Sequence, residues 1–152
     1  GLEFIAMNNE EYLPIGDDTY LGLVGEEHLN DVLLMINYDG LGHLLDTNTL
    51  AIFTSSPAFQ EQVVQISRSF PAVQWVDPWP ESNHSTFSWR GVPALAFSSR
   101  AIWHYCHQLN DTANWVSPAR IAEAVYLSRE ILQSVQEKPL DWLRPEAETP
   151  TA

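Results

Sequence analysis

The sequence predicts an α/β fold, a three-layer sandwich whose mixed, mostly parallel sheet is covered by helices on both faces. Short apolar runs of strand length alternate along the chain with segments that carry helical signals, which is the pattern of an α/β protein. Some of these runs are apolar at nearly every position, which is typical of strands covered on both faces. The length of 152 residues suits a single domain.

Four short strands are expected, each from a run of apolar residues. The first covers residues 2–7 and should be buried. The second covers residues 32–38 and stops at Asp39, which is followed by glycines. The remaining two are expected at residues 50–54 and 93–98.

Three helices are expected, and two of them have clear starting signals. Ser56 and Ser117 are each followed by proline; serine accepts a hydrogen bond from a free N–H at a helix start, and proline suits the first helical position. The helix after Ser56 should run over residues 58–68, and the helix after Ser117 should run to about residue 136. A short acidic helix is expected near residues 18–30.

The other segments are predicted to be irregular. Residues 71–90 contain three prolines among three tryptophans, and residues 99–116 read as a loop rich in histidine. Residues 138–152 are acidic and rich in proline, which favours a loosely ordered tail. The predicted globular part therefore covers residues 1–137.

The charge of the chain excludes several classes of partner. Twenty acidic residues face seven basic ones, giving a formal net charge of −13, and the first cation is Arg68. Such a surface repels nucleic acid and anionic lipid, so neither nucleic acid nor a membrane is an expected partner. No apolar run approaches the roughly 20 residues that span a bilayer. The single Cys106 excludes a disulfide framework and a thiolate zinc site.

Polar side chains follow the ends of the predicted strands. Glu10 and Glu11 follow the first strand, Asp39 follows the second, and His107 lies in the loop after the last. Taken singly, each is explained by an acidic turn or a surface histidine. In α/β sheets, however, ligands bind beyond the carboxyl ends of strands. Paired carboxylates there suit a metal ion, with one carboxylate as ligand and its neighbour as a proton acceptor.

Four motifs in order resemble those of the co-catalytic zinc aminopeptidases of metallopeptidase clan MH. That family includes aminopeptidase Y-type enzymes, and glutaminyl cyclases share its fold. The resemblance covers roughly residues 3–136. The motifs are Glu10-Glu11-Tyr12 through Asp17, Ile36-Asn37-Tyr38-Asp39-Gly40, Asn83-His84-Ser85-Thr86-Phe87, and His107 through Thr112.

The resemblance implies roles for the four strand-end residues. Glu10 is similar to the general base that activates a water between the metals. Glu11 and His107 correspond to ligands of one zinc, and Asp39 corresponds to a ligand of the other. Two zinc ions are therefore expected in the intact enzyme.

The resemblance also implies a substrate-binding motif. Asn83, His84 and Phe87 match a pattern normally written Ser-Asp-His-x-x-Phe, which borders the substrate pocket. Asn83 stands where the family usually has aspartate. Cys106 stands where some members have the tyrosine that assists the oxyanion, and Tyr105 is an alternative for that role.

Two ligands of the family have no counterpart in this sequence. The first histidine ligand and the bridging aspartate lie upstream of the Glu-Glu motif in the family, in a segment about as long as this chain. We therefore expect the C-terminal half of a peptidase domain, with one weakly held zinc or none in this chain. An exposed sheet edge would favour a homodimer or pairing with the missing N-terminal half.

The sequence thus predicts a zinc-dependent aminopeptidase acting on the N-termini of peptides. Two alternatives stay open: a non-catalytic binding or assembly module on the same fold, and a glutaminyl-cyclase-like acyltransferase. Zinc content separates the first alternative from the peptidase, and cyclisation of an N-terminal glutaminyl peptide selects the second.

Overall fold

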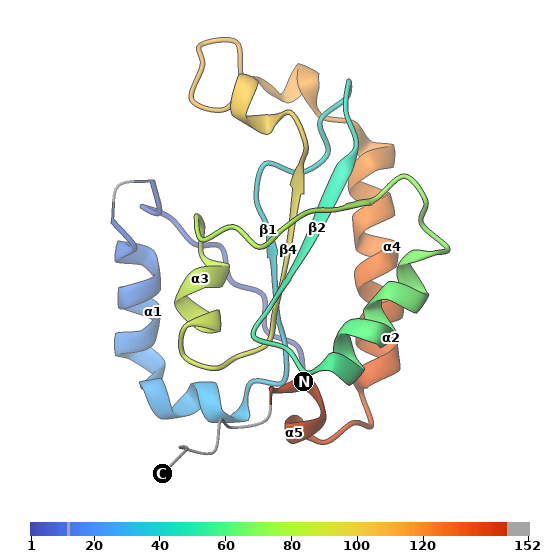
Figure 1. The fold of residues 1–152 in the computed structure, drawn as a ribbon. Coiled ribbons are helices and arrows are strands. Elements are labelled where there is room, and N and C mark those ends of the chain that lie inside the picture. The colour runs from blue at the N-terminus through green and yellow to red at the C-terminus, as the bar shows by residue number, and fades with distance from the viewer. Residues whose placement is uncertain (12, 146–152) are drawn as a thin grey trace.

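The computed structural model describes residues 1–11 and 13–145, and it has helices on both faces of one sheet (Figure 1). Helices α1 and α3 cover one face, and α2 and α4 cover the other. This arrangement confirms the predicted α/β class. The helices are α1 (Ile15–Val24), α2 (Pro57–Ser67), α3 (His84–Ser88), α4 (Pro118–Val135) and α5 (Leu140–Leu143), with 3-10 turns at Glu26–Asp31, Ile102–His104 and Ala113–Trp115.

The sheet has four strands in the order β1-β4-β2-β3. Strand β1 pairs with β4 in parallel and β2 pairs with β3 in parallel, whereas β2 and β4 are antiparallel. The sheet is therefore mixed and mostly parallel, as predicted. The strands are β1 (Met35–Tyr38), β2 (Asn48–Phe53), β3 (Gln74–Trp75) and β4 (Ala94–Ser99).

The main core lies between the sheet and helices α2 and α4. All six residues of β4 are buried, which explains why this strand is apolar over most of its length. Leu95 and Phe97 of β4 pack in one cluster with Phe59 of α2 and Leu127 and Ile131 of α4.

Both predicted helix starts are confirmed. The Ser56 hydroxyl accepts a hydrogen bond from the Phe59 N–H at 3.0 Å, and the Ser117 hydroxyl accepts one from the Arg120 N–H at 3.4 Å. Each serine stands directly before a proline at the first helical position. Helix α4 then spans the sheet and ends one residue before the predicted limit.

The strand predicted at residues 2–7 is wrong. This segment is extended but forms no strand, and Leu2 is 70% and Phe4 92% exposed. No strand among the described residues pairs with it. An apolar run is buried only where a neighbouring strand and a covering layer meet it. Here no described strand pairs with the run, and Met7 alone of its residues packs, partly buried, against the cluster of Leu21, Leu29, Phe87 and Val92.

Three further segments differ from their predictions. The acidic helix near residues 18–30 is divided at Gly25, whose φ of 81° breaks the helix into α1 and a 3-10 turn. The segment 71–90 contains β3 and α3. In the predicted tail, residues 138–145 carry α5, whose Leu143 is fully buried, while residues 146–152 lie outside the described residues.

No helix in residues 1–11 and 13–145 combines the length and apolar character needed to cross a membrane.

Candidate metal and catalytic site

A cavity of about 400 Å³ lies at the carboxyl ends of β1 and β4. The four residues predicted to perform the chemistry all line it: Glu10, Glu11, Asp39 and His107. They come from three segments that are far apart in the sequence. The fold therefore brings the predicted base and the predicted ligands to one cavity.

Glu11 and His107 are in direct contact. The Nε2 atom of His107 lies 3.0 Å from Oε2 of Glu11, and both side chains are more than half exposed. A tight turn presents the histidine: the N–H of Gln108 donates to the carbonyl of Tyr105 at 3.2 Å. His107 itself has a φ of 64°, a left-handed conformation that few residues other than glycine adopt. The two residues predicted to share one zinc are thus neighbours in space.

Asp39 is fixed by the end of strand β1. Its backbone N–H donates to the carbonyl of Phe97 in β4 at 3.0 Å, which continues the parallel ladder. Gly40 follows with a φ of 63°, and a Cβ at that position would lie 2.5 Å from the Ile102 side chain. Only glycine permits this close approach of the Asp39 loop to the segment that leads to His107.

Glu10 lies in a strongly acidic environment. Burial raises the pKa of its carboxyl above the ordinary value, and the nearby charges of Asp39, Glu11 and Asp17 raise it further. A hydrogen bond from the Ser82 backbone opposes this rise. A carboxyl group that holds its proton more firmly is better suited to accept one from water.

The donor set suits zinc in kind but not in number. Carboxylate oxygen and imidazole nitrogen are common zinc ligands, and catalytic zinc sites use three protein ligands. Among the described residues, no group of three or more His, Cys, Asp or Glu side chains is arranged to hold a metal ion. Glu11 and His107 therefore form a pair, with Asp39 further along the same cavity wall.

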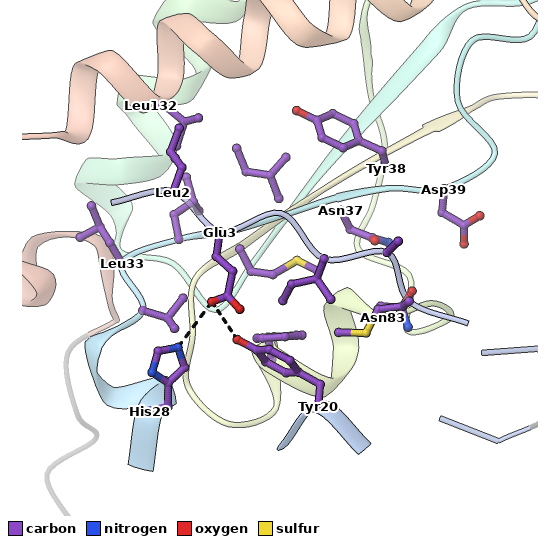
Figure 2. Close-up of a pocket in the computed structure, with 18 of the residues that line it drawn as sticks. Leu2, Glu3, Tyr20, His28, Leu33, Asn37, Tyr38, Asp39, Asn83 and Leu132 are labelled. Atoms are coloured by element: carbon purple, nitrogen blue, oxygen red, sulfur yellow. Dashed lines mark hydrogen bonds and ion pairs between the residues drawn. The ribbon is translucent and has the colours of Figure 1, made fainter. Parts of the chain in front are cut away.

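Two of the predicted substrate-binding residues line a second, larger cavity of about 1250 Å³. Asn83 and Phe87 lie on its wall. Asp39, which Figure 2 shows together with Asn83, lines both cavities, so the two adjoin. The Nδ2 atom of Asn83 donates to Oδ2 of Asp17 at 2.7 Å. At the other end of the cavity, Glu3 contacts His28 and Tyr20.

His84 is placed differently from its two motif neighbours. Its side chain is fully buried and lines neither of these cavities. Nε2 lies 2.8 Å from the Trp79 carbonyl and Nδ1 lies 3.3 Å from the Asn37 amide. A carbonyl only accepts, so Nε2 carries the proton and Nδ1 accepts from Asn37. Burial lowers the pKa of this ring, in agreement with a neutral imidazole.

Three residues around the candidate site have contacts that the motifs do not predict. Asn37 donates to the Ser82 hydroxyl at 2.9 Å, and Ser82 has a φ of 86°. Asp17 is 1% exposed in α1 and accepts from Asn83. These contacts join residues far apart in the chain, so although Asn37 and Asp17 lie within motifs, no local pattern indicates their partners.

Of the two candidates for the oxyanion role, Cys106 lines the smaller cavity and Tyr105 does not. Cys106 lines the smaller cavity beside His107, and burial, followed by the charge of Asp111, raises the pKa of its thiol. Tyr105 is not among the residues that line it. Its ring packs instead on His43, with centroids 4.3 Å apart.

The fold and the cavity place the chain among α/β proteins with an acidic, histidine-bearing site beyond the carboxyl ends of their strands. The sequence model of peptidase family M28 matches residues 1–132, and the chain belongs to that family. No curated protein matches the sequence.

Two solved structures share the fold. An aminopeptidase from Aneurinibacillus sp. strain AM-1 superposes with a TM-score of 0.65 at 17% identity, over 96% of this chain and 34% of that one. BSAP, a zinc aminopeptidase from Bacillus subtilis, superposes with a TM-score of 0.67 at 16% identity, over 91% of this chain and 37% of that one. The chain thus spans about a third of the length of each.

Proposed function

We propose that this chain supplies the general base and part of the zinc site of an aminopeptidase that removes N-terminal residues from peptides. One observation carries the proposal: Glu11 and His107 meet at 3.0 Å, in a cavity that Glu10 and Asp39 also line. Membership of peptidase family M28 and the fold shared with two aminopeptidases support it.

In this mechanism Glu10 moves the proton. Its carboxylate accepts a proton from the attacking water and returns it to the leaving amine. The raised pKa of Glu10 suits both steps, because the group must bind the proton and then release it. Glu11 and His107 would hold one zinc and Asp39 the other; bound zinc polarises a carbonyl oxygen and acidifies water.

The rest of the zinc site is proposed to come from residues outside those described. The described residues provide fewer donors than a catalytic zinc needs, and the chain spans about a third of each solved relative. We therefore propose that the chain is the C-terminal half of the peptidase domain. One edge of β1, beside the larger cavity, pairs with no strand of the described residues, and it suits either the other half or a second copy.

The charge of both cavities supports a substrate with a positive end. Neither lysine nor arginine occurs among the described residues that line them, whereas the smaller one has four carboxylates, those of Glu10, Glu11, Asp39 and Glu81. Such a surface attracts the ammonium group at the free N-terminus of a peptide.

The test uses the protein with its zinc site complete and a peptide whose N-terminus is free. We expect Glu10→Gln to lower turnover by a factor of about 10² to 10⁴, the usual contribution of a general base, and to retain zinc. The same peptide with an acetylated N-terminus is the control substrate. Turnover that is unchanged in Glu10→Gln removes Glu10 as the base.

A non-catalytic module is the second candidate, favoured by the lack of three converging donors among the described residues. Such a module would purify without stoichiometric zinc and would not release amino acids. If an N-terminal glutaminyl peptide were instead cyclised, the site would be an acyltransferase.

A further inference from the structure

A partly buried aromatic cluster lies beside the candidate site, and its members line neither of the two cavities. His43, 5% exposed, packs its ring 4.3 Å from that of Tyr105 and 5.8 Å from that of Trp115, measured between centroids. The rings of His43 and Trp115 are nearly parallel, at 6°. Tyr105 and Trp115 also face each other at 5.7 Å. We call these three residues the His43 stack.

The His43 stack touches the turn that presents His107. Tyr105 is the first residue of that turn, which the Gln108 N–H closes on the Tyr105 carbonyl. His107, third in the turn, has a φ of 64°, and such a conformation persists only where its surroundings hold it. Tyr105 therefore links the His43 stack to the turn that carries His107.

The His43 stack is equally tied to the loop that carries Asp39. The His43 N–H donates to the Ser99 hydroxyl at 3.0 Å, at the end of β4. The Leu44 N–H donates to the Trp115 carbonyl at 2.7 Å, and the Ser117 N–H donates to the Gly42 carbonyl at 2.8 Å. Residues 42–44 are thus fixed to the sheet and to the start of α4.

We propose that His43 and Tyr105 are positioning residues, whose packed rings hold the His107 turn in register with the Asp39 loop. This rests on the proposed function, since it takes His107 and Asp39 as ligands. Two contacts join the loops: the His43 ring on Tyr105, and Gly40 against the Ile102 side chain. Neither side chain lines either cavity, so each acts through the backbone that presents a ligand.

The test measures backbone order in the 152-residue chain by ¹⁵N relaxation, without metal. In the wild type we expect order parameters of about 0.85 for the amides of His107 and Gln108. His43→Ala should lower them to below about 0.6, whereas His43→Phe, which keeps a ring to stack, should preserve them. Tyr105→Leu, at a partly exposed position, repeats the test should His43→Ala not fold. His28→Ala, a histidine remote from the stack, is the control.

A merely structural role would lower overall stability and leave the order of the folded turn intact. Unchanged order in both His43→Ala and Tyr105→Leu, or equal loss in His43→Phe, overturns the proposal. Zinc binding at the His107 ring gives a second readout, with a dissociation constant about tenfold weaker in Tyr105→Leu. Zinc binding that is unchanged in His107→Ala contradicts the proposed ligand role of His107, and the relaxation result then decides the positioning proposal alone.

Discussion

The amide of Asn83 donates to the carboxylate of Asp17, with Nδ2 and Oδ2 2.7 Å apart. Asn83 stands where the resembling family usually has aspartate, and this contact gives the asparagine a physical reason. Asp17 is 1% exposed, and its other oxygen, Oδ1, has no partner among the described residues. A second carboxylate at position 83 would face a buried charge, whereas an amide satisfies it.

Asn83→Asp should therefore destabilise the chain. We expect a loss of about 1–3 kcal/mol at neutral pH, because the substitution removes the donor and adds a like charge. Urea denaturation measures this loss, with the exposed Asn114→Asp as the matched control. The double variant Asp17→Asn/Asn83→Asp should recover most of it, because the amide and the carboxylate then exchange places. A double variant that is no more stable than Asn83→Asp alone would show that the contact between residues 17 and 83 does not cause the loss of stability.

Glu10→Gln should stabilise the chain at neutral pH. The pKa of Glu10 is raised above its ordinary value of 4.5, first by burial and then by neighbouring carboxylates. The folded chain therefore holds this proton more firmly, and stability falls as the pH rises from that value through the folded pKa. The gain should be a few tenths of a kcal/mol, because Glu10 stays in contact with solvent. Thermal melts at about pH 7 and pH 3 should show the gain only at the higher pH.

At pH 6.5, the ordinary pKa of a histidine side chain, the ring of His84 should be neutral with its proton on Nε2. Burial lowers the pKa of the ring, so the folded chain binds fewer protons there than the unfolded chain. The neutral ring therefore contributes its full share to the stability of the folded chain above pH 6.5, and this share is lost as the pH falls through the pKa of His84 in the folded chain. A long-range ¹H–¹⁵N spectrum reads the tautomer directly. A doubly protonated ring at that pH would be incompatible with the contacts to Trp79 and Asn37.

Helix α5 should contribute strongly to stability. Leu143 is fully buried in the main core, and the Ser56 N–H donates to its carbonyl at 2.8 Å. Leu143→Ala should cost about 2–5 kcal/mol, the usual loss for a large-to-small change in a core. Leu109→Ala, at a fully exposed leucine, should change the denaturation midpoint little. Equal, small effects of both substitutions would mean that α5 is not part of the core.

The elements that sequence predicted well have local causes. The apolar run before Asp39 contains β1, the run at 93–98 is β4 to within one residue, and Ser56 and Ser117 cap their helices through their own hydroxyls. Strand β3 could not be predicted from the sequence, because it consists of two exposed residues, Gln74 and Trp75, and forms only by pairing with β2. The strand predicted over residues 2–7 does not form for the opposite reason: the run is apolar, but no strand of the described residues pairs with it.

The candidate site also combines features with local sequence signals and features that depend on contacts between distant segments. That Glu10, Glu11, Asp39 and His107 meet at one cavity could be expected, because they belong to motifs near strand ends, and their roles stay predictions. Asn37 and Asp17 also fall within motifs, but their contacts with Ser82 and Asn83 could not be predicted, because these arise only when segments far apart in the chain meet. His84 belongs to a motif, yet its full burial depends on Trp79 and Phe53, which pack against its ring.

The central claim is that Glu11 and His107 form part of a zinc site. Anomalous X-ray scattering at the zinc edge, from crystals of this chain grown with zinc, tests it most directly. We expect a peak about 2.0–2.2 Å from both Oε2 of Glu11 and Nε2 of His107. The chain has a second glutamate–histidine pair, Glu3 and His28, 3.7 Å apart, for comparison. Zinc at that pair instead, with no peak between Glu11 and His107, would mean that Glu11 and His107 are not zinc ligands.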